Sequence, residues 1–398
     1  MTSPVRTRVA VAAGRFAAAA SRRLGRGHGA IIGGRVTLAL DPKALHRLTA
    51  GRPVVIITGT NGKTTTTRLT AEALRASYHV ASNRGGNMPP GLIEAASDTS
   101  AEYLVLEVDE LYVPQVLDAT RAQVVVLLNL SRDQLDRITE IRRVAELWRS
   151  MLQRVDWPVA VIANCDDPLV VWAVGAHQPV RWVAGGYGWK DDATLCPECG
   201  RVRPIADDGN WTCTCGLNRP NAGRVPNLSL VMQLPGRFNL ANAAVATAVA
   251  VELGVPEADA ERRVAAVQDV AGRYATVQVA GRSVRLHLAK NPASWTETLD
   301  LIVSGRASAV LCLNARTADG MDTSWLWDVP FEGLQGRAVI ASGDRRLDLS
   351  VRLRLARVDH TVAADPLSDV AKLPAGPIEL LATYTAFHEV LDATGVVW

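Results

Sequence analysis

The sequence predicts an α/β protein of two domains, and two observations predict this class. Short runs rich in valine and isoleucine recur in the first half of the chain, at residues 54–58, 103–108, 124–130 and 159–163. These runs do not alternate apolar with polar residues, as expected of strands buried on both faces of a parallel sheet. Helical stretches separate the runs, and such alternation of strands and helices is typical of the α/β class.

Length and composition limit the possibilities further. A chain of 398 residues is too long for one ordinary hydrophobic core, so we expect two domains and room for a small insertion. The apolar fraction of 48% and the charged fraction of 21% are those of a soluble globular protein. The net charge of +3 does not by itself indicate a nucleic-acid-binding protein, and no apolar run approaches the ~20 residues that cross a bilayer.

We expect a central domain at residues 49–275 and a C-terminal domain at 276–398, after an N-terminal lead-in at 1–48. Turn residues and four of the six cysteines are concentrated at about 190–226, which indicates an insertion in the central domain. The elements expected after it are a helix at 242–253 and strands at 284–288, 309–313 and 338–342.

The N-terminal segment is basic. Its first 26 residues contain six arginines, interleaved with alanines, and no acidic residue. We favour a solvated helix whose alanine side packs on the body of the protein. A basic helix on an anionic membrane surface and a transit peptide are the alternatives. Because the segment has no continuous apolar stretch, we expect a cytoplasmic protein without a secretory signal, at most peripheral to the inner face of the plasma membrane.

A glycine-containing loop follows the first expected strand and precedes a helix. Glycines let backbone N–H groups converge on phosphate oxygens, and the helix N-terminus adds a positive dipole end. We expect Lys63 to reach the β- and γ-phosphates of ATP and the hydroxyl of Thr64 to bind Mg²⁺. The strict pattern has glycine where Ile57 stands, but the strand–loop–helix context favours phosphate binding over an incidental turn. The loop residues are Thr58, Gly59, Thr60, Asn61, Gly62, Lys63, Thr64 and Thr65.

Four cysteines form two close pairs, Cys196 with Cys199 and Cys213 with Cys215, each followed by glycine. This spacing is typical of a four-thiolate zinc ribbon, although one intervening residue in the second pair is less usual than two. Disulfides and free thiols are the alternatives, and a reducing cytosol disfavours disulfides. Four protein ligands leave no open position for water, so we expect the zinc to be structural.

The loop 59–65 resembles the phosphate loop of the Mur ligases, enzymes that phosphorylate a carboxylate and let an amine attack the acyl phosphate. Further segments are similar to the family's motifs and follow in the same order. They are Leu106-Glu107-Val108-Asp109-Glu110, residues 129–136 (NLSRDQLD), residues 164–167 (NCDD), residues 236–242 (GRFNLAN) and Gly272-Arg273. Each is weak alone, and their common order indicates the family.

The resemblance implies site residues in the central domain. Glu107 and Thr64 take the positions of magnesium ligands, and Glu107 and Lys63 those of catalytic groups. Asn239 and Asn242 match the asparagines on the adenine side, and Arg273 is placed to reach the γ-phosphate.

Two departures put second-metal chemistry in doubt. Gln134 stands where the family has a magnesium-binding histidine. No lysine lies between Asp136 and Asn164, where many members carry a carbamylated lysine.

One branch of the family is more similar still, the ligase subunits that amidate lipid II. The similar features are the zinc ribbon, the short lead-in that leaves little room for a nucleotide-sugar-binding domain, Lys290-Asn291-Pro292, and residues 313–328 (LNARTADGMDTSWLWD). The C-terminal domain would then be a Rossmann-like α/β domain. The resemblance implies ATP-dependent amidation of the D-glutamate α-carboxylate of lipid II to D-isoglutamine through an acyl phosphate.

The ammonia for that reaction implies a second chain. Cys165 and Cys312 lack the sharp glycine turn that presents a glutaminase nucleophile. The resemblance implies a partner glutamine amidotransferase subunit, and an aspartate in the C-terminal domain that orients the partner's catalytic histidine. We choose Asp319, with Asp322 second, and the alternative is that these acids cap a loop. Residues 325 and 327 are tryptophans that would share one side of a strand, facing either the partner or the core.

Two other functions are weighed against this one. A folylpolyglutamate synthase-like enzyme, or another Mur-like amino-acid ligase, would add an amino acid rather than ammonia and is not expected to carry the ribbon. A zinc-ribbon nucleic-acid-binding NTPase would need a dense basic and aromatic strip beside the ribbon, which the sequence does not show.

Overall fold

The computed structural model describes residues 3–23, 29–132, 138–185, 192, 194–202, 206, 210–222, 232–268, 270 and 273–396. Gln134, Asp136 and Gly272, which the sequence analysis singled out, lie outside the described residues. Within the described part of the chain, no helix has the length and apolarity that crossing a membrane requires.

The central domain is built on a six-stranded, entirely parallel sheet in the order β2-β3-β1-β4-β5-β6. The four expected strands are confirmed, and the short edge strands β2 and β6 were not foreseen. The bounds are β1 (Val54–Thr58), β2 (Val80–Ser82), β3 (Tyr103–Glu107), β4 (Val124–Leu127), β5 (Ala160–Asn164) and β6 (Val180–Val183). All of β1 is buried, as a strand covered on both faces requires.

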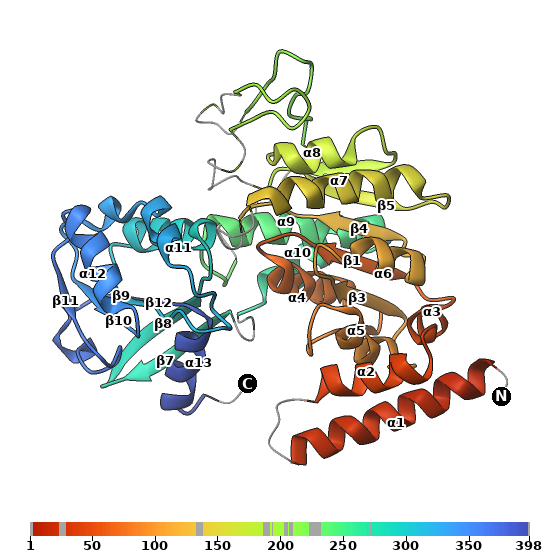
Figure 1. Ribbon diagram of the computed structural model, residues 1–398, viewed down its shortest axis with the longest axis horizontal. Helices are drawn as coiled ribbons and strands as arrows, with labels where there is room; N and C mark the ends of the chain where they lie inside the picture. Colours follow the sequence, from red (N-terminus) through yellow and green to blue (C-terminus); the bar gives the residue numbers. More distant parts are fainter. Residues whose placement is uncertain are drawn as a thin grey trace.

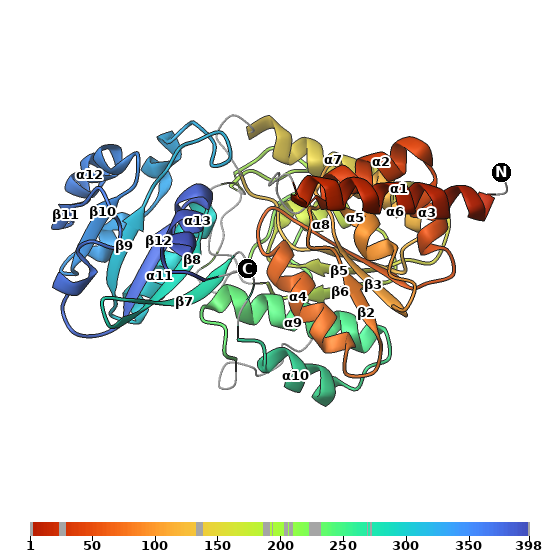
Figure 2. The ribbon, with the colours of Figure 1, turned by 90° about the horizontal axis from the view of Figure 1, so that it is seen from below.

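Helices cover both faces of this sheet, which Figure 2 shows from below. One face packs against α4 (Lys63–Leu74) and α9 (Arg237–Glu252), and α10 (Glu257–Ala265) packs on these two helices. The other packs against α5 (Pro89–Ala96), α6 (Val113–Thr120), α7 (Ile138–Arg154) and α8 (Pro168–Val174). Because β1 is central and its carboxyl end leads into α4, the phosphate loop sits at the middle of the sheet edge.

The chain begins with an antiparallel helical hairpin, α1 (Ser3–Arg23) and α2 (Ala30–Leu40), followed by α3 (Ala44–Thr49). The helices approach closely because small residues face one another: a Cβ at Gly14 would lie 2.2 Å from Oγ1 of Thr37. A Cβ at Gly34 would lie 1.8 Å from the carbonyl oxygen of Pro90, so α2 also packs tightly on α5. Ala10 and Ala18 are buried, which confirms the expected alanine-packed helix.

The second sheet has the order β11-β10-β9-β12-β8-β7, with only the β7–β8 pair antiparallel. The strands are β7 (Tyr274–Val279), β8 (Arg282–Leu288), β9 (Ser308–Cys312), β10 (Val339–Ser342), β11 (His360–Val362) and β12 (Ile378–Ala382). Helices α11 (Pro292–Ser304), α12 (Arg346–Leu355) and α13 (Tyr384–Ala393) accompany it. Figure 1 shows this domain beside the central one.

One expectation about this domain is wrong. Trp325 and Trp327 do not share a strand but lie in a 3-10 helix, η3 (Ser324–Asp328). The tighter winding turns the two side chains apart, so Trp325 is 5% exposed and Trp327 is 58% exposed. Trp325 packs on Trp295, with ring centroids 5.5 Å apart, in the core beside η4 (Phe331–Leu334). A further 3-10 turn, η5 (Val370–Lys372), precedes β12.

Candidate active site

The phosphate loop makes a tight turn between β1 and α4. Gly59 and Gly62 have φ angles of 139° and 85°, in the region that favours glycine. A Cβ at Gly59 would lie 2.8 Å from Cβ of Leu128, and one at Gly62 would lie 2.7 Å from Oδ1 of Asn242. Among the described residues no side chain caps the N-terminus of α4, where the first backbone N–H groups have no intrahelical partner. These N–H groups are therefore available to phosphate oxygens.

Side-chain amides fix the shape of this loop. Asn129, just after β4, accepts a hydrogen bond from the backbone N–H of Asn61 at 2.9 Å and donates to its carbonyl oxygen at 3.0 Å. The side chain of Asn61 donates to Oγ of Ser131 at 2.9 Å and accepts from Nδ2 of Asn291 at 3.0 Å. Asn291 is fully buried and caps α11, so this bond joins the loop to the C-terminal domain.

Lys63 lies at the start of α4 and is buried. Its Nζ donates to the carbonyl oxygen of Gly59 and to Oε1 of Glu110, both at 2.6 Å. Burial raises the pKa of the Glu110 carboxyl, while the neighbouring ammonium of Lys63 works in the opposite direction. Glu110 is the last residue of the segment 106–110 that resembles a family motif, and no role was predicted for it.

Glu107, the expected magnesium ligand, ends β3 next to the phosphate loop strand. Asn83 fixes its backbone from both sides: the Glu107 N–H donates to Oδ1 at 2.8 Å and Nδ2 of Asn83 donates to the carbonyl oxygen at 3.0 Å. The side chain of Glu107 remains partly exposed at the carboxyl end of the sheet. The carboxylate paired with Lys63, however, is that of Glu110.

A cavity opens in front of the loop, between the two domains. Thr58 is fully buried behind the loop, and Gly59 and Thr60 likewise do not line the cavity. Apolar side chains, among them Phe238 and Val245, cover the wall near α9. The expected site residues that line the cavity are Asn61, Gly62, Lys63, Thr64, Thr65, Asn239, Asn242 and Arg273.

The C-terminal domain contributes titratable groups that sequence reasoning missed. Glu297 of α11 lines the cavity, and its pKa is raised to about 7 by burial and by the neighbouring Asp300, against an opposing effect of Arg237. His287 of β8 also lines it and lies 2.7 Å from Oε2 of Glu379, which is fully buried. No recognised motif contains these residues, so only the folded chain reveals them.

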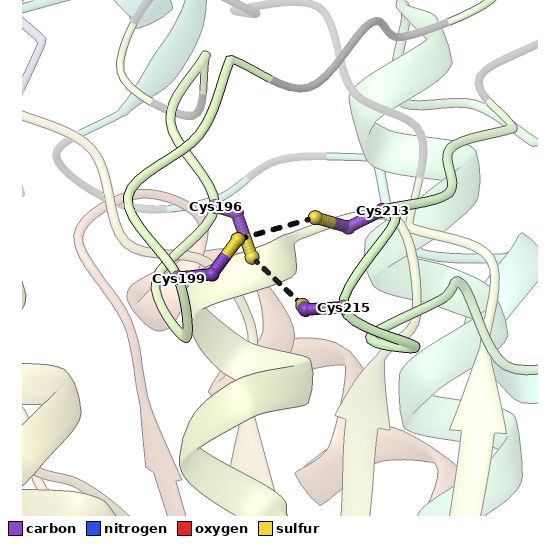
Figure 3. Close-up of side chains that lie close together, drawn as sticks. All are labelled: Cys196, Cys199, Cys213 and Cys215. Carbon is purple, nitrogen blue, oxygen red and sulfur yellow. Dashed lines mark hydrogen bonds between the residues drawn. The ribbon is translucent and has the colours of Figure 1, made fainter.

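The four expected zinc ligands converge (Figure 3). All four sulfurs lie within 4.8 Å of one another, and Sγ of Cys196 is 3.6 Å from that of Cys215. Sγ of Cys199 is 3.5 Å from that of Cys213. These separations are too long for disulfides, and they fit the edges of a tetrahedron whose Zn–S bonds are about 2.3 Å. The donor set therefore fits a structural zinc ion.

The ribbon is joined to the carboxyl end of β5. Arg219 donates to Oδ1 of the buried Asp166 at 2.7 Å, and Trp172 of α8 donates to Glu198 at 2.6 Å. The backbone N–H of Asp166 in turn bonds to the side chain of Asn164, which lines the cavity. The ribbon is thus connected to the site through a short chain of polar contacts.

The two candidate aspartates of the C-terminal domain differ in their surroundings. Asp319 is 6% exposed, and its carboxylate accepts from the backbone N–H and hydroxyl of Thr385 and from the N–H of Arg316, at 2.6–3.0 Å. Asp322 is more exposed and accepts from the N–H and hydroxyl of Ser324 through one oxygen, Oδ1. The hydroxyl of Ser324 lowers the pKa of Asp322, which favours its charged form.

The two remaining cysteines are buried thiols. Burial raises the pKa of Cys165 and of Cys312 to about 12. Neither thiol is therefore activated as a nucleophile.

Known family models match both halves of the chain. The Mur ligase middle domain matches residues 57–250, and the MurT ligase C-terminal domain matches residues 288–387. Both agree with the motifs on which the resemblance was based, and the resemblance to the Mur ligases is confirmed.

Individual relatives agree with these matches. Lipid II isoglutaminyl synthase (glutamine-hydrolyzing) subunit MurT of Staphylococcus aureus (strain N315) is 29% identical, over 95% of each chain. The same-named subunit of Streptococcus pneumoniae (strain ATCC BAA-255 / R6) is 29% identical over 99% of this chain and 98% of its own.

Two solved structures share the fold. A pseudomurein peptide ligase type C from Methanothermus fervidus has a TM-score of 0.66 at 17% identity, covering 88% of this chain and 81% of its own. MurF from Acinetobacter baumannii has a TM-score of 0.65 at 17% identity, covering 90% and 80%.

Metal analysis tests the cysteine site. We expect the purified chain to contain about one zinc ion, and Cys199→Ser to reduce this to near zero because three thiolates hold the ion poorly. Cys165→Ala, which removes a thiol outside the ribbon, should retain the metal. Equal zinc content in both variants would contradict the assignment.

Unfolding as a function of pH tests Glu297. Because its folded pKa of about 7 exceeds the ordinary 4.5, the folded chain holds this proton more tightly than the unfolded chain does. The resulting contribution to stability is fully present below about pH 4.5 and is lost as pH rises through 7. In urea unfolding, we expect the free energy of unfolding of the wild type to fall by up to about 3 kcal/mol between pH 5 and pH 8, relative to that of Glu297→Gln. The exposed-site control Glu252→Gln should follow the wild type, and parallel profiles for wild type and Glu297→Gln would refute the effect.

Proposed function

We propose that this Mur ligase-like chain is the ATP-dependent ligase subunit of a lipid II isoglutaminyl synthase. The reaction converts the α-carboxylate of D-glutamate in lipid II to the amide of D-isoglutamine. The observation that carries the proposal is the cavity between the domains, lined by the phosphate loop on one side and by α11 and β8 on the other. The full-length similarity to two MurT subunits supports the choice of substrate.

The chemistry takes two steps. A carboxylate oxygen of the substrate attacks the γ-phosphorus of ATP, and ADP leaves with the β–γ bridging oxygen. Ammonia then attacks the carbonyl carbon of the acyl phosphate, loses a proton, and expels inorganic phosphate to leave the amide. Because the phosphoryl group carries most of the charge, catalysis is mainly positioning and charge neutralisation.

This chain supplies those functions from residues around the loop. The ammonium of Lys63 and the free N–H groups of α4 neutralise the phosphates, and Arg273 lines the same cavity as a third positive group. Thr64 and Glu107 are the proposed magnesium ligands, and Mg²⁺ when bound supplies further charge neutralisation. Asn239 and Asn242 of α9 hold the adenine end of the nucleotide, beside the apolar wall.

Ammonia comes from a partner in this proposal. Since ammonia is mostly protonated at neutral pH and neither Cys165 nor Cys312 is an activated thiol, a glutamine amidotransferase subunit supplies it. Lipid II is anchored in a bilayer, so the chain works at the membrane surface, as a cytoplasmic protein peripheral to its inner face.

We assign the aspartate that completes the partner's active site to Asp322 rather than Asp319. An aspartate that orients another chain's histidine needs an accessible, ionised oxygen. Asp319 is buried and accepts three hydrogen bonds from its own chain, which fits a loop-holding role. Asp322 has one oxygen outside its own turn, and the loop around it exposes Met321 and Trp327, apolar groups suited to a partner surface.

An amidation assay tests the ligase. With lipid II, ATP and Mg²⁺, we expect a product about one mass unit lighter when ammonium is supplied, and none with glutamine until the amidotransferase subunit is added. Lys63→Ala should lower the rate at least about 100-fold, because it removes the positive charge that neutralises the transferred phosphoryl group. Lys43→Ala, which changes an exposed lysine, should leave the rate unchanged. Addition of glutamate to a folate, with no lipid II product, would instead establish a folylpolyglutamate synthase-like enzyme.

A second assay separates the two aspartates. In the complex, we expect Asp322→Asn to lower glutaminase activity by about 10³-fold while ammonium-driven amidation persists, because ammonium bypasses the partner's triad. Asp319→Asn should instead lower the thermal stability of the chain by breaking bonds to Thr385. Full glutaminase activity in Asp322→Asn, with loss in a stably folded Asp319→Asn, would reverse the assignment.

A further inference from the structure

The outer face of α1 exposes three apolar side chains that the body of the protein does not cover. Val5, Val9 and Phe16 are 45%, 52% and 78% exposed. With 3.6 residues per turn, the three side chains lie within about 40° of one another around the helix axis. They therefore form one apolar stripe, which we call the α1 stripe.

This stripe lies opposite the face of α1 that holds the helix to the protein. The packed face consists of small or short residues that contact α2, among them Gly14. At the C-terminal end of α2, the hydroxyl of Thr7 donates to the carboxylate of Asp41 at 2.6 Å. Figure 1 shows α1 as the outermost helix, with α2 between it and α5. The α1 stripe is thus directed away from the body, and its bulky side chains are not needed for packing.

Charge around the stripe has one sign. The first 40 residues contain seven arginines and no acidic residue, whereas the other 358 residues contain 36 basic and 40 acidic residues. Arg8, Arg15 and Arg22 recur every seven residues, so they follow one flank of the stripe. All three are exposed, and Nη2 of Arg15 also donates to the carbonyl oxygen of Ser97 at 3.4 Å. The net positive charge of the chain therefore comes from its first 40 residues.

We propose that the α1 stripe and its arginine flank dock the protein on an anionic lipid surface, with the three apolar side chains in the headgroup region. A basic helix with one apolar side matches such a surface in both charge and polarity. A second copy of the chain fits poorly, because it would bring two sets of arginines together and three side chains bury too little area for a stable dimer. Nucleic acid would leave the apolar stripe unused.

Docking would place the active site in a fixed relation to the membrane. A Cβ at Gly34 of α2 would lie 1.8 Å from the carbonyl oxygen of Pro90 at the start of α5, and one at Gly86, before α5, would lie 3.6 Å from Cδ1 of Ile31. In that segment Asn83 holds the backbone of Glu107 at the site edge. Only the short segment before α5 therefore separates the α1–α2 hairpin from Glu107 at the edge of the candidate active site. This consequence rests on the proposed function, whereas lipid binding itself does not.

Vesicle flotation of the full chain tests the docking. We expect binding to equimolar phosphatidylcholine–phosphatidylglycerol vesicles, weakened by salt, and little binding to phosphatidylcholine alone. Phe16→Ser and the double variant R8Q/R22Q should each weaken binding about tenfold or more. Leu347→Ser, which removes an apolar side chain of 67% exposure from α12, is the matched control and should bind like the wild type. Far-UV circular dichroism checks that every variant is folded.

Three results would overturn the docking: no preference for anionic vesicles, unchanged binding of both hairpin variants, or equally tight binding to duplex DNA. Amidation assays with Phe16→Ser separate this inference from the proposed function. Turnover of a water-soluble, short-chain lipid II should be unchanged, and turnover of vesicle-embedded lipid II should fall. If the wild type turns over neither substrate, the proposed function fails while the vesicle result still decides the docking.

Discussion

The side chain of Asn61 links the phosphate loop to the end of β4 and to the C-terminal domain. Its amide donates to Ser131 after β4 and accepts from Asn291 at the start of α11, while Asn129 holds its backbone on both sides. Such neutral hydrogen bonds contribute only about 1 kcal/mol each, but a buried amide without a partner costs more than that. Hydrogen bonds of Asn61, Asn129 and Asn291 therefore connect the phosphate loop, the sheet edge and the C-terminal domain, beside a cavity with walls from both domains.

Both walls of this cavity carry charged or titratable side chains. Nζ of Lys63 donates to the carbonyl oxygen of Gly59 and to the carboxylate of Glu110, which hold its ammonium beside the phosphate loop. Glu297 and the His287–Glu379 pair bring acid–base groups from the other wall. A site assembled from two walls can change its electrostatics when the domains move, without altering the geometry inside either domain.

How much of this was predictable follows from the range of the interactions involved. The buried strands around β1, the loop glycines and the four cysteines are local patterns, and each was predicted from sequence. The edge strands β2 and β6 were missed because only three or four residues form each. The prediction for Trp325 and Trp327 was wrong because their two-residue spacing in the sequence is also compatible with a strand. In the structure they lie in a 3-10 helix, where Trp325 packs on Trp295 in the core. The Asn61–Asn291 bond joins residues 230 positions apart and has no local signature.

The four-cysteine ribbon, if it holds zinc as its donor set allows, ties maturation of the chain to the metal. Its Arg219 neutralises the buried Asp166, and Asp166 is bonded to Asn164 in the wall of the cavity. Small metal-binding segments without a core of their own generally gain their folding free energy from the bound metal. Delivery of zinc after synthesis would then complete the wall of the catalytic cavity, and cells short of zinc would accumulate chains that are intact in sequence yet unfinished as enzymes.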